Sequence, residues 1–301
     1  MAPEEVNFWR PSGKGFSALE IGAPFIFKLR GSNYIVGGGF FVRYERLPLS
    51  LAWDVFGQEN GAADWSKFER LIRRTRGYEE VYPEIGCIIL NQPFFIPREH
   101  WVAAPGEWKP EIVTGKTYDD AEGWGRHLWG EIQRWIPSFE PVEISGETPA
   151  AVREPERLYG NEYLYRSRLG QGAFRVLVTD AYQKRCAISG ERTLPVLQAS
   201  DIKPYGERPN RVDNGLLLRS DLHILFDRGY LTVTPELRVE ISGRIKEDYE
   251  NGRDYYRLHG NELIVLPTSR INRPNPEFLR WHNEKVFRSQ SLQGHPSPDS
   301  P

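Results

Sequence analysis

Apolar residues alternate with polar residues or glycines in the first third of the chain, which is the pattern of half-buried strands. Residues 24–29 (PFIFKL) and 34–42 (YIVGGGFFV) predict two strands, and the Gly-Ser-Asn segment between them predicts a hairpin turn. A continuous apolar run over residues 85–90 predicts a buried strand. Successive glycines weaken a strand unless another group approaches its backbone closely, so residues 37–39 predict such an approach.

Three segments of the same region predict helices, because their apolar residues recur at helical spacing. The clearest has Trp65, Phe68, Leu71 and Ile72 three or four positions apart. The predicted helices cover residues 49–56, 65–75 and 121–135.

The second half of the chain has shorter apolar runs that end in polar residues. Residues 196–200 predict a strand that leads into Asp201. Helical spacing begins near Ser220 and Asp221, either of which is a suitable N-cap, and a last helix is predicted over residues 276–287. Strands and helices in separate runs predict an α+β fold class.

Composition divides the chain of 301 residues into two parts with a segment between them. Eight of the nine tryptophans precede residue 136, whereas residues 136–160 are rich in Pro, Glu and Ser and lack periodicity. We therefore expect a first domain over residues 1–140, a linker over 141–160, a second domain over 161–288 and a disordered tail over 289–301.

The overall composition excludes several classes of protein. Two cysteines in unrelated contexts predict neither a disulfide framework nor a zinc site ligated by cysteine. The absence of a long apolar run and of a signal peptide predicts a cytoplasmic protein without a membrane segment. The net charge is −2, but nucleic-acid binding depends on local patches. Several basic residues lie close together in the sequence of the second half: Arg166, Arg168, Arg175, Lys184, Arg185 and Lys203.

Three polar residues in the second half have the order of a phosphodiester-cleaving metal site. Asp201 ends an apolar run, Asn214 follows thirteen residues later, and His223 lies nine residues further at the start of a helical pattern. Such sites combine a base or ligand at a strand end, a positioning amide in a loop and a metal ligand on a helix. Taken alone, Asp201 is equally suited to cap a turn before Pro204, and Asn214 to form one.

Residues 197–227 (LQASDIKPYGERPNRVDNGLLLRSDLHILFD) resemble the core of HNH endonucleases, in which a ββα unit holds a metal. The resemblance extends upstream through RCAISG at residues 185–190 and downstream to PEFLRWHNEKVF at residues 276–287. It covers roughly residues 165–288, and it has one departure: the family usually has a histidine where this chain has Asp201.

The resemblance implies roles for individual residues. Asp201 would be the general base, a ligand of one Mg²⁺ or Mn²⁺ ion, or both, although its ordinary pKa of about 3.9 makes it a weaker base than histidine at about 6.5. His223 would be a metal ligand and Asn214 would orient the catalytic loop. The supporting residues would fix His223, contact phosphates or supply an alternative base: Asp227, Arg168, Gln171, Arg175 and His282.

The strand and helix order of residues 5–120 resembles the PUA-like superfamily of small β-barrels, which includes EVE, ASCH and SRA domains. This resemblance implies a pocket for a flipped, modified base, for which stacking faces and a few polar groups are needed. The pocket candidates are Asn7, Phe8, Trp9, Phe40, Phe41, Trp53 and Asn91. Aromatic residues of a small barrel are also typical core residues.

A chain that combines these two domains is similar in architecture to a modification-dependent restriction endonuclease. Its partner would be double-stranded DNA with a modified base, expected to be cytosine, and cutting both strands would require a homodimer. Two alternatives stay open: a catalytically inactive HNH-fold protein that binds DNA, and an HNH nuclease without modified-base specificity. The departure at Asp201 motivates the first of them.

Overall fold

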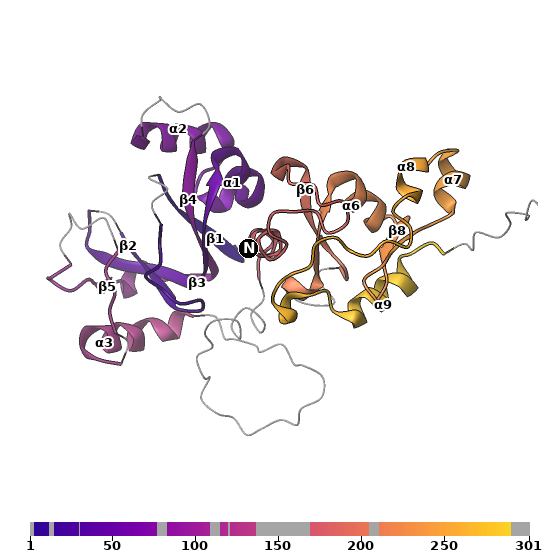
Figure 1. Ribbon diagram of the computed structural model, residues 1–301. Coiled ribbons are helices and arrows are strands. Elements are labelled where there is room, and N and C mark those ends of the chain that lie inside the picture. The colour runs from indigo at the N-terminus through magenta and orange to yellow at the C-terminus, as the bar shows by residue number, and fades with distance from the viewer. Residues whose placement is uncertain are drawn as a thin grey trace, which may run out of the picture. The chain divides into compact units, whose positions relative to one another are not determined.

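The computed structural model describes residues 3–11, 15–29, 31–76, 83–108, 115–119, 121–136, 169–204 and 211–289. The chain forms two compact units, Met1–Ala173 and Phe174–Pro301, which are described separately below (Figure 1). The expected linker over residues 141–160, and residues 290–301 of the expected tail, lie outside the described residues.

An antiparallel sheet forms the centre of the N-terminal unit, in the strand order β1-β4-β3-β2, with β5 paired to β3 (Figure 1). The hairpin predicted from residues 24–42 is confirmed as β2 and β3, although β3 continues to Pro48. The strand bounds are β1 Glu5–Arg10, β2 Pro24–Lys28, β3 Tyr34–Pro48, β4 Glu84–Phe95 and β5 Val102–Ala103.

The sheet of this unit is open among the strands that the structure describes. β1 and β2 are the two ends of its pairing order, and no pairing between them closes a barrel within the described ranges. The mixed helix and sheet content agrees with the predicted α+β class. The PUA-like barrel is not confirmed, because a barrel requires the first and last strands of a sheet to pair.

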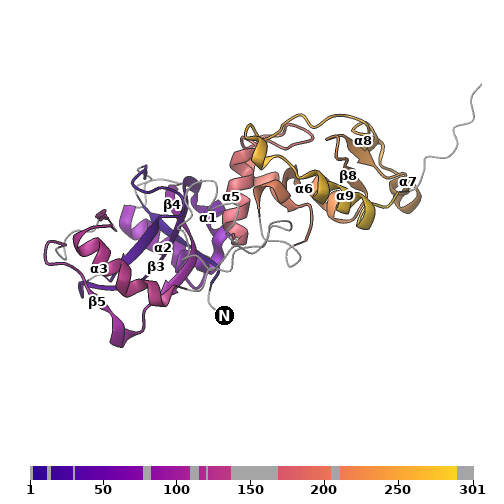
Figure 2. The same ribbon diagram turned by 90° about the horizontal axis from the view of Figure 1, so that it is seen from below.

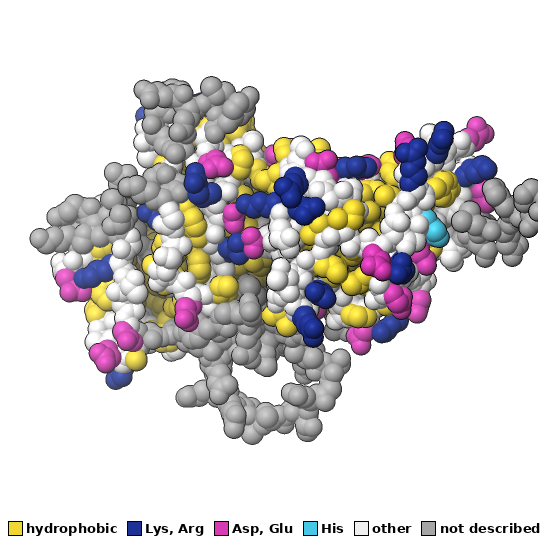
Figure 3. Space-filling model, viewed as in Figure 1, with side chains coloured by type: hydrophobic (Ala, Val, Ile, Leu, Met, Phe, Trp, Pro, Cys, Tyr) yellow, Lys and Arg dark blue, Asp and Glu magenta, His cyan; other side chains and the backbone are white. Residues whose placement is uncertain are grey.

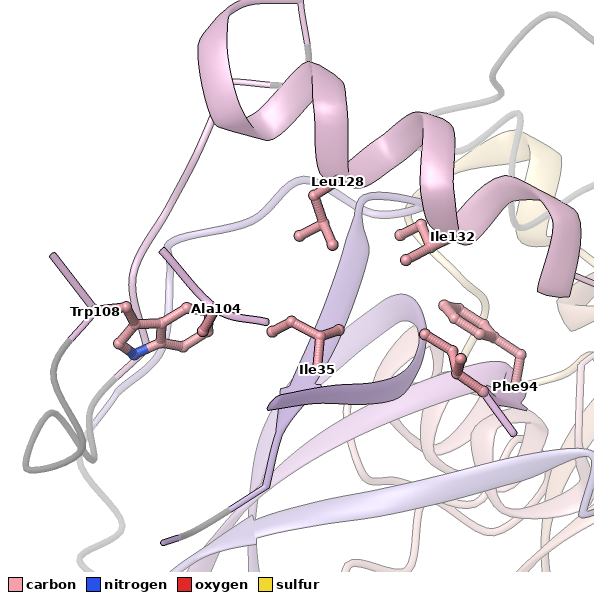
Figure 4. Packing of buried hydrophobic residues seen from close by; sticks show 7 residues of the cluster. Ile35, Phe94, Ala104, Trp108, Leu128 and Ile132 are labelled. Carbon is pink, nitrogen blue, oxygen red and sulfur yellow. The ribbon is translucent and has the colours of Figure 1, made fainter. Parts of the chain in front are cut away.

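The helices of this unit lie in the middle and toward the end of its sequence. Their bounds are α1 Leu49–Phe56, η1 Gly57–Asn60, α2 Trp65–Arg76, η2 Arg98–His100, α3 Gly123–Ile132 and η3 Gln133–Trp135. Leu128 and Ile132 of α3 point toward Ile35 and Phe94 of the sheet, and together they form a buried cluster (Figure 4). The helix predicted over residues 121–135 is therefore confirmed, with its last turn in 3₁₀ form.

The three glycines of β3 lie where neighbouring strands come closest to its backbone. A Cβ atom at Gly37 would lie 2.3 Å from the carbonyl oxygen of Phe94, and one at Gly38 would lie 2.6 Å from that of Phe25. Any larger residue would push β2 or β4 away from β3. The close approach predicted from residues 37–39 is made by the protein's own strands.

Glu5 of β1 binds the first turn of α5 (Gln171–Ala181), and this turn belongs to the N-terminal unit. The amides of Gly172 and Ala173 donate to its two carboxylate oxygens at 2.6 and 2.7 Å. Glu5 is 2% exposed, and burial raises its pKa to about 7 although the two amide bonds lower it. Such carboxylates satisfy amides that have no partner within the helix.

The C-terminal unit contains two short hairpins and several helices (Figures 1 and 2). Its strand bounds are β6 Leu197–Asp201, β7 Gly215–Arg219, β8 Leu231–Val233 and β9 Val239–Ile241. Its other elements are η4 Leu194–Val196, η5 Val212–Asn214, α6 Ser220–Asp227, α7 Arg244–Tyr249, α8 Arg253–Tyr256, η6 Arg270–Asn272 and α9 Pro276–Lys285. The strand before Asp201 and the last helix are confirmed, but the N-cap of α6 is Arg219 rather than Ser220 or Asp221.

Among the residues that the structure describes, every helix is too short or too polar to cross a membrane.

Gly170 offers a test of the contact between Glu5 and α5. A Cβ atom there would lie 2.4 Å from Cδ of Glu5, so Gly170→Ala is expected to lower the free energy of unfolding by about 1–3 kcal/mol. Urea unfolding followed by tryptophan fluorescence measures this, since eight of the nine tryptophans precede residue 136.

Gly130→Ala is the matched control, because Gly130 lies in α3 and a Cβ atom added there would meet nothing within 4 Å. Alanine is the better helix former, so the control is expected to gain up to about 1 kcal/mol. A Gly170→Ala protein as stable as the wild type would contradict the close packing of Glu5.

Candidate active site

A strand hairpin followed at once by a helix forms the candidate site (Figure 1). β6 and β7 pair antiparallel, with Gln198 opposite Leu218 and Asp201 opposite Gly215. Arg219 ends β7 and Ser220 begins α6, so no connecting residue separates strand from helix. Leu222 and Phe226 are fully buried, and they fix the helix against the core of the unit.

One face of β6 contacts α6 through two polar side chains from each element. Nδ1 of His223 lies 2.6 Å from Oε1 of Gln198. Nε2 of His223 lies 3.3 Å from Oδ2 of Asp227, and the hydroxyl of Ser200 donates to the other oxygen of Asp227 at 3.2 Å. Gln198 and Ser200 are two positions apart in a strand, so their side chains leave the same face.

Asp201 is half-buried and ends β6. It follows Ser200 directly and is paired with Gly215 of β7. The sequence predicted a metal site made of Asp201 and His223, whereas the carboxylate that the structure brings beside His223 is Asp227.

Asn214 is buried and holds the backbone that follows Asp201. Its side-chain oxygen accepts from the amide of Lys203 at 3.0 Å, and its side-chain nitrogen donates to the carbonyl of Lys203 at 2.9 Å. The amide of Ile202 also donates to the backbone oxygen of Asn214 at 2.8 Å. These three bonds fix the direction in which the chain leaves β6.

A divalent cation fits the donor set next to α6. His223 supplies a ring nitrogen, Asp227 a carboxylate that is 53% exposed, and Ser200 a hydroxyl. Groups of three or more His, Cys, Asp or Glu residues suited to a metal are absent from the part of the chain that the structure describes. Mg²⁺ is compatible with so few protein ligands, because it retains several waters and often binds through one or two carboxylates.

His282 of α9 is a structural residue rather than an alternative base. It is 2% exposed, its ring stacks on Phe226 with centroids 3.7 Å apart, and its Nε2 lies 3.1 Å from the carbonyl oxygen of Phe226. Its Nδ1 lies 2.7 Å from the hydroxyl of Thr232. Both ring nitrogens are therefore engaged, and burial lowers the pKa of His282 to about 4.

The other residues predicted to support the site lie on α5 or outside the described residues. Arg168 lies outside the described residues, Gln171 is exposed at the start of α5, and Arg175 is half-buried on the same helix. Lys203 lies over the ring of Trp281, 5.3 Å from its centroid. Figure 3 shows Lys and Arg side chains over the region of β6 and over α7 and α8, interspersed with acidic and apolar ones.

The predicted base-pocket residues make contacts in different parts of the N-terminal unit. Trp9 donates from its indole nitrogen to the carbonyl of Asn60 at 2.9 Å and packs on Phe68, which Trp53 also contacts. Phe8 precedes Trp9 in β1 and so points to the opposite face of the sheet. Asn7 and Asn91 are buried, as is Phe41, and Phe40 is half-buried.

Phe8 belongs to an aromatic group on its own face of the sheet. Its ring stacks on Phe27 with centroids 5.7 Å apart, and Phe25 lies at 5.1 Å. Phe8 is 45% exposed, whereas both partners are half-buried. Among the predicted base-pocket residues, Phe8 therefore presents the accessible aromatic surface.

Comparison with known proteins identifies the C-terminal unit in part. The family model described as HNH endonuclease matches residues 186–234, which include β6, β7 and α6. Residues 186–234 form an HNH endonuclease domain. No protein of the curated set matches the chain.

One solved structure that resembles the chain is a "Modification dependent TagI restriction endonuclease". The identity is 15% and the TM-score 0.28, over 85% of this chain and 55% of that one. The present chain thus spans about half the length of that protein.

Sequence reasoning missed Gln198 and Ser200 as parts of the HNH site. The signal that could have found them is the alternation of a strand, since both positions face the helix that follows the hairpin. Asp227 lies one helical turn after His223, which is the spacing that brings two side chains of a helix together.

Acidification is expected to destabilise the C-terminal unit through His282. Its pKa is about 4 in the folded protein and about 6.5 when unfolded, so the unfolded chain binds the proton first as the pH falls. Between pH 6.5 and 4 the free energy of unfolding should fall by up to about 3 kcal/mol. Hydrogen exchange of peptides from residues 211–289, at several urea concentrations, measures this unit separately.

The variant His282→Gln should have a lower free energy of unfolding at pH 7.5 and a smaller further loss on acidification. His127→Gln is the control, because His127 is exposed on α3 and should leave the profile of residues 211–289 unchanged. An unchanged acid response of His282→Gln would contradict the assignment of this response to the buried imidazole.

Proposed function

We propose that the chain is a metal-dependent DNA endonuclease whose HNH domain hydrolyses phosphodiester bonds. The observation that carries this proposal is the contact of His223 with Asp227 at 3.3 Å, beside the strand that ends in Asp201. The family match over residues 186–234 supports a nuclease, and DNA is the substrate that the family and the restriction-enzyme likeness imply.

Asp201 acts as the proton acceptor in this proposal. A water oxygen attacks phosphorus, Asp201 takes a proton from that water, and the bond from phosphorus to the 3′-oxygen breaks. Asn214 orients this step because its bonds to Lys203 and Ile202 hold the backbone after Asp201. The leaving oxygen is then protonated by solvent.

His223 and Asp227 are the ligands that the geometry favours for one Mg²⁺ or Mn²⁺ ion, with Ser200 beside them. Asp201 remains an additional candidate from the sequence. When bound, the ion supplies stabilisation of negative charge on the scissile phosphate. The neutral imidazole of His223 suits Mn²⁺, and the carboxylate of Asp227 suits either ion.

The N-terminal unit reads a modified base, expected to be a cytosine, and the enzyme works as a homodimer in the cytoplasm. Phe8 supports the reading role, since an exposed aromatic ring that stacks on Phe27 and contacts Phe25 offers a platform for a base. A homodimer would place two HNH domains on opposite strands of double-stranded DNA.

Substitution of the HNH residues tests the nuclease. His223→Ala, Asp227→Ala and Asp201→Asn are each expected to lower the cleavage rate by about 10²–10⁴-fold, because each removes a ligand or the proton acceptor. Nicking of plasmid DNA in Mg²⁺ and, separately, Mn²⁺ measures the rate, with circular dichroism to check the fold.

Asp254→Asn is the control, since Asp254 lies in α8 and forms an exposed ion pair with Arg257. Full activity of Asp227→Ala with loss of activity in Asp201→Asn would indicate that Asp201, and not Asp227, is the metal ligand. Full activity of all three site variants would overturn the assignment of the HNH site.

Matched DNAs with unmodified, 5-methyl and 5-hydroxymethyl cytosine test the reading role. Cleavage is expected to favour a modified DNA, and Phe8→Ala should reduce that preference by about 5–100-fold because a stacked base contributes about 1–3 kcal/mol. Phe95→Ala is the control, since Phe95 is 60% exposed at the end of β4. Equal cleavage of all three DNAs would leave a nuclease without modified-base specificity.

The replacement of the family histidine by Asp201 favours a second candidate, a DNA-binding protein that does not cleave. Asp201→His restores the usual residue and separates the two. A wild-type protein that binds DNA without cutting it, together with a cutting Asp201→His variant, would establish this second function.

A further inference from the structure

Gln198 holds the side of His223 that faces away from Asp227. Its Oε1 lies 2.6 Å from Nδ1 of His223, whereas Nε2 of the same ring lies 3.3 Å from Asp227. We propose that Gln198 is a positioning residue that keeps the proton of His223 on Nδ1 and leaves the lone pair of Nε2 available for a divalent cation. This inference rests on the proposed function of the HNH site.

The backbone fixes the distance between the two residues. Gln198 is paired with Leu218 across the hairpin, and α6 begins directly after β7. Leu222, next to His223, is fully buried and prevents the helix from rotating. The amide of Gln198 therefore meets the ring of His223 without any loop whose movement would separate them.

The chemistry of the contact selects one tautomer. An amide oxygen only accepts hydrogen bonds, so the ring nitrogen that faces it must carry the proton. A neutral imidazole carries a single ring proton. That proton lies on Nδ1, the nitrogen that makes the shorter contact. Nε2 is then an acceptor, which next to the carboxylate of Asp227 is the arrangement that a cation between them requires.

Asp227 is poorly suited to orient the ring by itself. Its side chain is 53% exposed, and its other oxygen accepts from Ser200. If Nε2 carried the proton, it would donate to Asp227 and the ring would have no lone pair on the metal side. Gln198 removes this competing arrangement, and so His223 and Asp227 both offer lone pairs to the same ion.

Replacement of Gln198 by methionine and by glutamate tests the role. Methionine keeps the length of the side chain but has no amide oxygen, whereas glutamate keeps an acceptor at the same place. The first readout is the ¹⁵N chemical shifts of His223 in the metal-free protein at pH 8, assigned by comparison with His223→Gln. The wild type and Gln198→Glu should have the proton on Nδ1, and Gln198→Met should give a mixture of tautomers.

The second readout is the affinity for Mn²⁺, measured by calorimetry on the full chain. Gln198→Met should bind Mn²⁺ about 10–100-fold more weakly than the wild type, as loss of a partner that orients a ligand does elsewhere. Gln198→Glu should retain or exceed the wild-type affinity. Gln133→Met is the control, because Gln133 is exposed in η3 of the other unit.

Two results would overturn the inference: a proton on Nε2 of His223 in the wild type, or unchanged tautomer and Mn²⁺ affinity in Gln198→Met. Failure of the proposed function gives a different result. In that case the tautomer of His223 still depends on Gln198, but the wild type neither binds Mn²⁺ nor cleaves DNA.

Discussion

The direct passage from β7 into α6 is the constraint on which the HNH site depends. With Arg219 as the last residue of the strand and Ser220 as the first of the helix, α6 has no freedom to move away from the hairpin. The buried side chains of Leu222 and Phe226 then fix its rotation. His223 and Asp227 consequently face β6, where Gln198 and Ser200 meet them.

Local patterns in the sequence predicted most elements of the fold, because their signals are local too. The hairpin of β2 and β3, the helices α1 to α3 and the strand before Asp201 all follow from spacing and turn residues. The closed barrel implied by the PUA-like resemblance is not confirmed, since closure depends on pairing between strands that are distant in sequence. The glycines of β3 were located correctly, but the groups that approach them are strands of the same sheet.

The candidate site residues divide in the same way. Asn214 and His223 belong to the sequence motif. In the structure His223 contacts Gln198 of β6, and Asn214 contacts Lys203, which follows β6. Gln198 lies in no motif and is recognised only from its distance to His223. Likewise, Phe8 and Trp9 are neighbours in sequence, yet the pleat of β1 sends them to opposite faces, and only the three-dimensional arrangement shows that they contact different groups.

β6 carries residues for both tasks of the proposed mechanism. One face carries Gln198 and Ser200 toward His223 and Asp227, and Asp201 is the last residue of the same strand. An exchange of histidine for aspartate at this position alters the proton acceptor of the proposed mechanism, whereas the contacts of the His223 ring described above are made by Gln198 and Asp227. Asn214 bonds to the backbone of Ile202 and Lys203, so it holds the residues directly after Asp201 through the main chain.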